Sequence, residues 1–420
     1  MPSPPLQSGS RRHARIIAAW LLVGCALVGA TLVVGGVTRL TGSGLSMVDW
    51  EPVSGAVPPM SAEAWEREFA AYRDSPEYRL VNRGMSLAEF KRIFWFEYAH
   101  RLLGRVIGLV FIIPFAVFLL RRMIPRSLIP RLLLLFALGG AQGLLGWWMV
   151  RSGLVDIPRV SPYRLTAHLA LAVLVYALTL WTALSLLRPG SPWRDPASAP
   201  LERGRVAPRA AGAGDREPES PWGIGLRRGS AIVLGLAALT LLSGGFVAGL
   251  DAGLVYNTFP RMGDGWIPPD LFGATPWWLS PFEDRTTAQF NHRILAIVLL
   301  AGVTTLWWAC ARRAPVPARR WAHAGFAAAW VQAALGVATL LLFVPIPLAA
   351  LHQADALILI TALLGLTFEL RRADVDARMP ARGRGQPVDA GGQMPARERG
   401  QRVEAGGRTW PGGGGTDVGQ

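Results

Sequence analysis

Two short segments of the sequence combine a histidine with a polar residue one helical turn before it. Glu97 precedes His100, and Gln289 precedes His292 at the same spacing. Residues three apart share one face of a helix, so each histidine is expected beside its acid or amide. An imidazole can ligate a metal and a carboxylate can accept a proton, whereas an amide cannot ionise. The first segment is therefore the candidate for catalysis and the second for binding alone, the plainer alternative being that Glu97 only pairs with an arginine such as Arg101.

Two further histidines, His168 and His352, complete a set of four that is expected at one depth in a membrane. Each of the four precedes a basic residue by about twenty positions, which is roughly 30 Å of helix at a rise of about 1.5 Å per residue. These basic residues are Arg121, Arg188, Arg312 and Arg371. Because roughly 30 Å is the thickness of the hydrocarbon core, all four histidines are predicted near the outer surface.

The matched positions of these histidines favour a functional site. A single membrane histidine often only bonds to a neighbouring helix, but several in duplicated positions are candidates for function. Two facing histidines suit a haem iron better than zinc, which takes three or four protein ligands. Arg101 and Arg293 follow two of the histidines and are candidates for contacts to haem propionates, with anchoring at the interface as an equal alternative. His13 and His323 stand near arginines and are interpreted as polar residues of the inner face.

The composition indicates an integral membrane protein. Of 420 residues, 51% are hydrophobic, and they fall into blocks of the length that spans a bilayer. The net charge of +15 comes from arginines between these blocks and in the tails, which is the positive-inside pattern rather than that of a nucleic-acid-binding protein. Eight spans are predicted, at about 16–37, 95–120, 128–150, 164–187, 230–250, 288–311, 321–344 and 347–370. The basic loops are expected on the inner side of the membrane and the acidic loop at 251–287 on the outer side. With eight spans, this arrangement places both termini inside.

The long outer loop after the first span is expected to contain helices. From Ser61 to Tyr72, aromatic and charged residues alternate at helical spacing, as in a helix lying on a membrane surface. Ser86 and Glu89 form a capping-box pattern, which predicts the start of a helix that continues through His100 into the second span.

The two halves of the chain repeat one another. Gly35-Gly36 recurs as Gly244-Gly245, and a Gln-to-Gly pattern at 142–146 recurs at 332–336. The sequence therefore predicts an all-α integral membrane protein whose eight transmembrane helices form two tandem four-helix bundles in a parallel pseudo-two-fold repeat. The expected divisions are a disordered N-terminus (1–15), a first half (16–187), a flexible cytoplasmic linker (188–229), a second half (230–371) and a disordered C-terminal tail (372–420).

Four long segments carry a resemblance to a known family. GGVTRLTGSGLSMVDWEPVSGAVPP, FWFEYAHRLLGR, GGFVAGLDAGLVYNTFPRMGDGWIP and QFNHRILA resemble the haem A synthase family, COX15/CtaA, in its proteobacterial and mitochondrial branch. The likeness covers about residues 16–371 and leaves out the linker and the tail. The Gram-positive branch carries a cysteine pair in outer loops, which this chain lacks, so no thiol-redox role is carried over.

The resemblance implies an oxidoreductase that converts the C8 methyl group of haem O to the formyl group of haem A for terminal oxidases, by two successive hydroxylations. It implies that His292 and His352 ligate the iron of a haem b cofactor in the second half. It also implies that His100 and His168 flank the iron of the substrate haem in the first half. Glu97 matches an acid that is functionally important in the family. The electron acceptor is left open.

Two other functions are weighed against this one. A b-type electron-transfer protein with two haems needs one haem toward each leaflet, whereas the depth count puts all four histidines on one side. A membrane haem-binding carrier has no need of an acid beside a ligand. The expected partners are haem O, membrane lipid, a haem O synthase and an electron-transfer protein, with self-association left open and no nucleic acid. The expected location is a bacterial inner membrane, with both termini cytoplasmic and the haem sites toward the periplasm, because no transit peptide precedes the first span.

Overall fold

The regular structure of this chain is helical in every part that the computed structural model describes, namely residues 6–49, 54–154, 158–188 and 221–378. No strand occurs in these ranges, so the predicted all-α class is confirmed. The helices are α1 (Leu6–Leu40), α2 (Ala62–Arg73), α3 (Pro76–Leu80), α4 (Leu87–Leu120), α5 (Ile129–Gly153), α6 (Pro162–Leu187), α7 (Pro221–Gly249), α8 (Ser280–Glu283), α9 (Arg285–Arg313), α10 (Val316–Leu341) and α11 (Ile346–Arg378).

Eight of the described helices are long and apolar enough to cross a membrane, which confirms the predicted number of spans. They are α1, α4, α5, α6, α7, α9, α10 and α11. Large apolar side chains point outward from them; Ile113 on α4 is 57% exposed and Ile297 on α9 is 56% exposed. Such exposure suits helices whose outer faces meet lipid instead of water.

Several helices begin earlier than the hydropathy predicts. Helix α1 begins at Leu6 rather than near Ile16, and α7 begins at Pro221 rather than near 230. Part of the predicted N-terminal tail and of the predicted linker is therefore helical. The rest of that linker, 189–220, and the tail from 379 onward lie outside the described residues.

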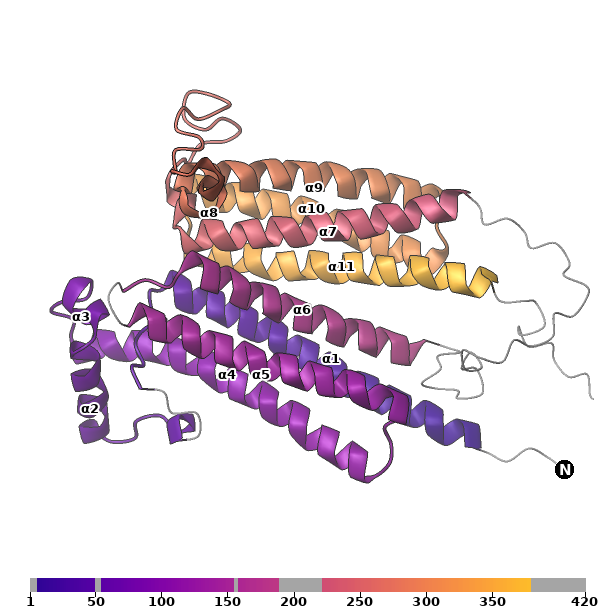
Figure 1. Cartoon of the computed structure of the whole chain (residues 1–420), viewed down its shortest axis with the longest axis horizontal. Coiled ribbons are helices and arrows are strands. Elements are labelled where there is room, and N and C mark those ends of the chain that lie inside the picture. The colour runs from indigo at the N-terminus through magenta and orange to yellow at the C-terminus, as the bar shows by residue number, and fades with distance from the viewer. Residues whose placement is uncertain (1–5, 50–53, 155–157, 189–220, 379–420) are drawn as a thin grey trace, which may run out of the picture. The chain divides into compact units, whose positions relative to one another are not determined.

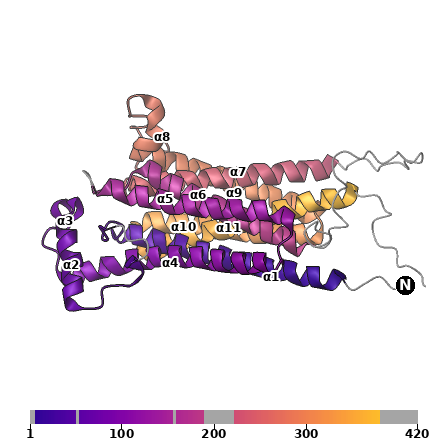
Figure 2. The same ribbon diagram turned by 60° about the horizontal axis from the view of Figure 1, so that its bottom comes forward.

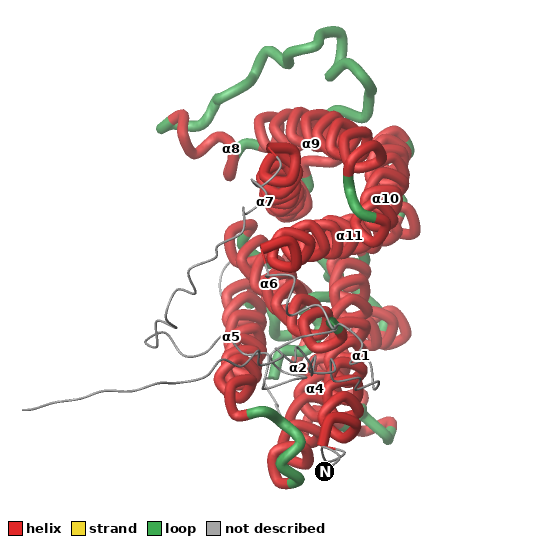
Figure 3. The backbone as a smooth tube through the Cα atoms, turned by 90° about the vertical axis from the view of Figure 1, so that its right-hand side faces the viewer, coloured by secondary structure: helices red, strands yellow, loops and turns green. Residues whose placement is uncertain are grey.

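The eight long helices form two groups, as Figure 1 shows: α1, α4, α5 and α6 lie together, and α7, α9, α10 and α11 lie together. The end-on view in Figure 3 shows the same grouping, whereas the two groups overlap in the turned view of Figure 2. Helix α6 packs against α7 and joins the groups. We call them the first and the second helix group; they correspond to the two predicted halves, whose symmetry stays a prediction.

Polar contacts hold the two helix groups to each other. The Tyr176 and Thr361 hydroxyls are 2.7 Å apart. The Gln353 amide donates to the carbonyl of Leu32 at 2.9 Å, an approach that Gly36 permits because a β-carbon there would overlap the Gln353 side chain. Each of these pairs joins one helix of the first group to α11 of the second.

The outer helix α2 packs on an extension of α4. At 34 residues, α4 is roughly 50 Å long and reaches well beyond a hydrocarbon core. Its first turn has the predicted capping box of Ser86 and Glu89. Trp65 and Phe69 of α2 are buried against Phe90 and other aromatic residues of α4. The helix predicted at 61–72 is thus confirmed, but its apolar face packs on protein rather than on a membrane surface.

Candidate functional site

Each of the four predicted histidines lies against a glycine on the preceding long helix of its own group. A β-carbon on that glycine would come within about 3 Å of the imidazole Cε1 atom, closer than ordinary carbon contacts of about 3.5–4.0 Å. The pairs, with the distance from such a β-carbon to Cε1, are Gly35 and His100 (2.7 Å), Gly146 and His168 (2.9 Å), Gly244 and His292 (3.1 Å), and Gly336 and His352 (2.9 Å). Glycine thus makes the room that each ring occupies.

The four glycines place the histidines at corresponding ends of the helices. Each glycine lies in the last two turns of α1, α5, α7 or α10, before the chain leaves for an outer connection. Within each helix group the two imidazoles are close enough to interact electrostatically, His100 with His168 and His292 with His352. The structure therefore brings the predicted residues together in two pairs, one in each group.

The pair in the second helix group has hydrogen bonds to both Nδ1 atoms. Nδ1 of His292 lies 2.8 Å from the Ser243 hydroxyl of α7. Nδ1 of His352 lies 3.2 Å from the backbone carbonyl of Gln332 on α10. These contacts turn Nε2 of His292 away from Ser243, whereas Nε2 of His352 lies 3.4 Å from the side-chain amide nitrogen of Gln332, which a ligand on that atom would displace.

The pair in the first helix group lacks such contacts. Within the described part of the chain, the buried Nδ1 atoms of His100 and His168 have no hydrogen-bond partner. Gln142 of α5 donates instead to the backbone carbonyl of His168 at 3.0 Å. Buried polar atoms are usually satisfied, so two orphaned imidazole nitrogens in one helix group mark a place where a ligand is expected.

The donor set fits a haem iron. Among the described residues, no group of three or more His, Cys, Asp or Glu side chains gathers around one point, as a zinc site requires. Two imidazoles on opposite helices are the ligand set of a six-coordinate haem. The residues that would hold haem are therefore the two histidine pairs.

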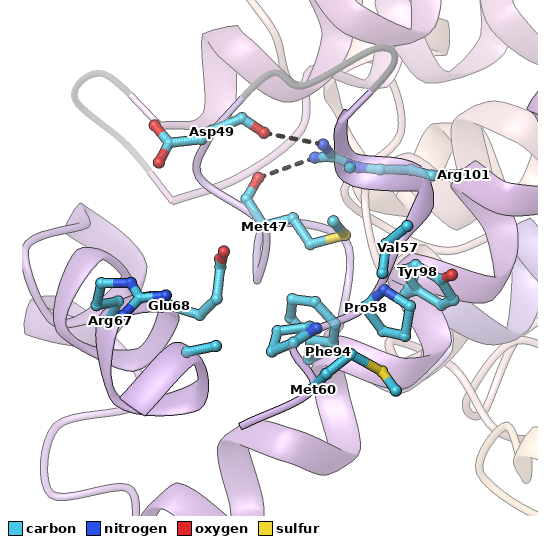
Figure 4. A pocket seen from close by; sticks show the side chains of 13 residues that line it. Met47, Asp49, Val57, Pro58, Met60, Arg67, Glu68, Phe94, Tyr98 and Arg101 are labelled. Atoms are coloured by element: carbon cyan, nitrogen blue, oxygen red, sulfur yellow. Dashed lines mark hydrogen bonds between the residues drawn. The ribbon is translucent and has the colours of Figure 1, made fainter. Parts of the chain in front are cut away.

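Glu97 is buried and bound by four donors. Its Oε1 atom accepts from Arg101 Nε at 3.0 Å and Nη2 at 2.5 Å. Its Oε2 atom accepts from the Ser46 hydroxyl at 2.7 Å and from the Met47 backbone N–H at 2.9 Å. Arg101 also donates to the carbonyls of Met47 and Asp49, as Figure 4 shows. Glu97 and Arg101 together hold the outer loop that follows α1, which agrees with the plainer interpretation of the acid as an arginine partner.

The second helix group repeats this arrangement with an amide. Gln289 donates to the carbonyl of Tyr256 at 3.1 Å, and Arg293 donates to the same carbonyl at 2.7 Å. Arg293 also donates to the carbonyl of Thr258 at 2.8 Å. Arg101 and Arg293 are thus committed to loop carbonyls, and their contact with propionates stays a prediction.

A cavity of about 190 Å³ lies beside this loop at the outer end of the first helix group. Figure 4 shows Arg101 at its edge, with Phe94 and Tyr98 of α4 facing Arg67 and Glu68 of α2 across it. Its wall therefore combines aromatic and charged side chains next to the Glu97–Arg101 pair.

A second buried acid, Glu77, lies in the outer helices, where no sequence pattern predicts a buried carboxylate. The Glu77 carboxylate accepts from the Tyr72 hydroxyl at 3.3 Å, and that hydroxyl accepts from the Asn82 amide at 2.7 Å. Burial, together with the negative charge of Glu97, raises the pKa of Glu77 to about 7. Burial also raises the pKa of Tyr72 above its usual value. A hydropathy scan sees only an acid in an outer loop, so burial of this kind has no sequence signal.

The comparisons with known proteins cover both histidine pairs. The family model COX15-CtaA, described as cytochrome oxidase assembly protein, matches residues 18–364. The chain is 50% identical to a haem A synthase of Nitrosospira multiformis, over 85% of this chain and 94% of that protein. It is 46% identical to a haem A synthase of Parvibaculum lavamentivorans, over 84% of this chain and 93% of that one. It is 45% identical to human haem A synthase COX15, over 87% of each chain.

Proposed function

The chain belongs to the COX15–CtaA family of cytochrome oxidase assembly proteins, and we propose that it is a haem A synthase, an oxidoreductase that acts on haem O. Its reaction is the oxidation of the C8 methyl group to the formyl group of haem A. The observation that carries this proposal is the pair of glycine-backed imidazoles in each helix group, inside a family match that spans both groups. The resemblance seen in the sequence and the relatives agree on this function.

We propose different tasks for the two histidine pairs. His292 and His352 hold a haem b cofactor, which supplies redox chemistry when bound. His100 and His168 flank the iron of the substrate haem O. The support is that Nδ1 of both second-group histidines is hydrogen bonded, whereas Nδ1 of both first-group histidines is not.

Glu97 acts, in this proposal, at the outer end of the substrate pair. One helical turn separates it from His100, and it keeps Arg101 and the loop at Ser46–Met47 in place. Oxidation of a methyl group removes protons and builds positive character on carbon, which a fixed carboxylate stabilises. Two successive hydroxylations, with water lost from the resulting diol, give the formyl group; together they remove four electrons from the methyl carbon, which an external electron acceptor must take up.

We also propose a bacterial inner membrane as the location, with both termini in the cytoplasm and the histidine pairs toward the periplasm. The eight apolar helices and the bacterial relatives support a multi-pass membrane protein. The arginine-rich inner connections support this orientation.

The function is tested by the pigment extracted from membranes that contain this chain and a haem O source. Haem A that appears only with the intact chain supports the synthase, and haem O that stays unchanged supports a carrier. His292→Ala is expected to strip or perturb the low-spin b-type spectrum of the purified protein. His100→Ala is expected to leave that spectrum largely intact while conversion is lost. Loss of all haem from His100→Ala would contradict the division between the pairs.

A further inference from the structure

The two helix groups differ at one position that faces a histidine. Gly35 of α1 and Gly244 of α7 occupy matching places, each against the first histidine of its group. The residue before Gly244 is Ser243, whose hydroxyl lies 2.8 Å from Nδ1 of His292. The residue before Gly35 is Val34, a hydrocarbon side chain that offers no such contact. Both rings also lie near the carbonyl of a threonine one turn earlier, so this carbonyl does not distinguish them.

The contacts of Ser243 suit the tautomer of His292 that binds iron through Nε2. An iron on Nε2 of His292 requires the ring proton on Nδ1, and the Ser243 hydroxyl then keeps its single proton for the carbonyl of Thr240, 3.2 Å away. Its oxygen is then the acceptor for Nδ1–H of His292. A neutral imidazole that carries its proton on Nδ1 presents a lone pair on Nε2. Ser243 therefore orients the ring and exposes Nε2 as a ligand.

The second histidine of the same group is fixed by the same logic. Nδ1 of His352 lies 3.2 Å from the Gln332 carbonyl, which can only accept, so Nδ1 carries the proton here too. The matching residue of the first group, Gln142, turns its amide to the backbone of His168 and leaves Nδ1 of that ring without a partner among the described residues. Nδ1 is thus hydrogen bonded in both rings of the second group and, within the described residues, in neither ring of the first.

We propose that Ser243 is a positioning residue that makes His292 a lasting iron ligand, and that Val34 leaves His100 free to release its haem. This inference rests on the proposed function, since it assigns a cofactor to one pair and a substrate to the other. A cofactor must stay bound through many turnovers, whereas haem O must enter and haem A must leave. Partners that bind the second nitrogen of a metal-bound histidine fix the ring and raise its basicity, and their loss typically weakens metal binding by about 10–100-fold.

The test compares haem release from purified full-length variants in detergent, measured as transfer to excess apomyoglobin. Ser243→Ala is expected to speed release of the low-spin b-type haem by roughly 10–100-fold. The same variant is expected to raise the reduction midpoint potential, because a less basic imidazole stabilises ferric iron less. Ser243→Thr keeps a hydroxyl and is expected to restore both values. Ser230→Ala is the matched control, since Ser230 is another buried serine of α7 and donates to the Arg227 carbonyl of its own helix at 2.9 Å.

The converse variant, Val34→Ser, gives the first group the missing hydroxyl. It is expected to increase the amount of haem O and haem A that copurifies with the protein and to slow product release. If Ser243→Ala releases haem at the rate of Ser230→Ala, while His292→Ala strips the haem, the positioning role is refuted and the proposed cofactor pair stands. If His292→Ala leaves the low-spin spectrum intact, the cofactor pair itself is wrong and this inference falls with it.

Discussion

Replacing Glu97 by glutamine keeps the shape of the side chain and removes half of its acceptor capacity. The carboxylate now serves two donors on each oxygen, Arg101 on one and the Ser46 hydroxyl and Met47 amide on the other. In either orientation of the amide, its NH₂ group would face one of these donor pairs. Glu97→Gln therefore leaves either a buried cation or a loop without its acceptor.

The expected cost follows from the burial of the pair. The side chain of Glu97 is 3% exposed and that of Arg101 is 13% exposed, so solvent replaces little of the lost interaction. Hydrogen bonds to charged groups contribute about 1.5–3 kcal/mol each, and removing one partner of a buried ion pair costs about 3–5 kcal/mol. We expect the loop at Ser46–Met47 to be destabilised by about 3 kcal/mol.

Hydrogen exchange at the Met47 amide measures this directly, because that N–H donates to Glu97. About 3 kcal/mol corresponds to exchange faster by roughly two orders of magnitude. Conversion of haem O is expected to be abolished or to stall at the hydroxylated intermediate, while the haem content of the second helix group stays near normal. The mirror change Gln289→Glu should not make the second group active.

A double substitution, Glu97→Gln with Arg101→Gln, shows whether Glu97 acts by holding Arg101 or acts independently of it. If the acid works through Arg101, the two single substitutions lower conversion by similar factors and the double substitution adds little. An acid that acts independently gives additive losses. Near-normal haem A production by Glu97→Gln, together with unchanged exchange at Met47, would refute the reasoning.

Three further predictions concern the glycine backing, the second acid and the topology. Gly146→Ala should push the His168 ring by roughly 0.5–1 Å and lower conversion about tenfold or more, whereas Gly143→Ala, with nothing within 4 Å of its new β-carbon, should not; equal activities would contradict the backing role. The folded-state pKa of Glu77, about 7, lies above its ordinary 4.5, so the native protein loses stability as pH rises from about 4.5 to 7. Glu77→Gln should remove that loss, so its free energy of unfolding at pH 8 should be higher by up to about 3 kcal/mol and its unfolding temperature higher, with no gain at pH 4.5. A variant that is less stable at pH 8 would show that the carboxylate is stabilising. A reporter fused after Arg126 should read cytoplasmic and one within 60–85 external, and the reverse result would overturn the proposed orientation.

The parts of the fold that depend on local chemistry could be predicted from the sequence. Apolar blocks of bilayer length give the spans, and Ser86 with Glu89 gives a helix start, because both signals lie within a few neighbouring residues. Helix starts such as Leu6 were placed too late, since hydropathy marks where a helix meets lipid and not where its hydrogen bonds begin. The packing of α2 was missed because an aromatic face looks the same whether lipid or α4 covers it.

The candidate site could be predicted as a set of residues but not as a set of contacts. The repeat pointed to the histidines and to Glu97 because their types and spacing recur. The difference between Val34 and Ser243 was visible in the same repeat, yet both residues are ordinary in a membrane helix. The difference between these two residues can be interpreted only from the structure, in which the Ser243 hydroxyl lies 2.8 Å from Nδ1 of His292.

The glycine backing changes how natural sequence variants of this chain should be interpreted. Scales that rank exchanges by side-chain similarity treat Gly35→Ala or Gly336→Ala as mild, and in a helix exposed to solvent alanine even stabilises. Here the added methyl group would occupy the space of an imidazole ring. The smallest possible exchange would therefore displace a histidine that is far from it in the sequence. A cell that carries such a variant of this chain is expected to show the defect of a lost histidine ligand, although the histidine itself is intact.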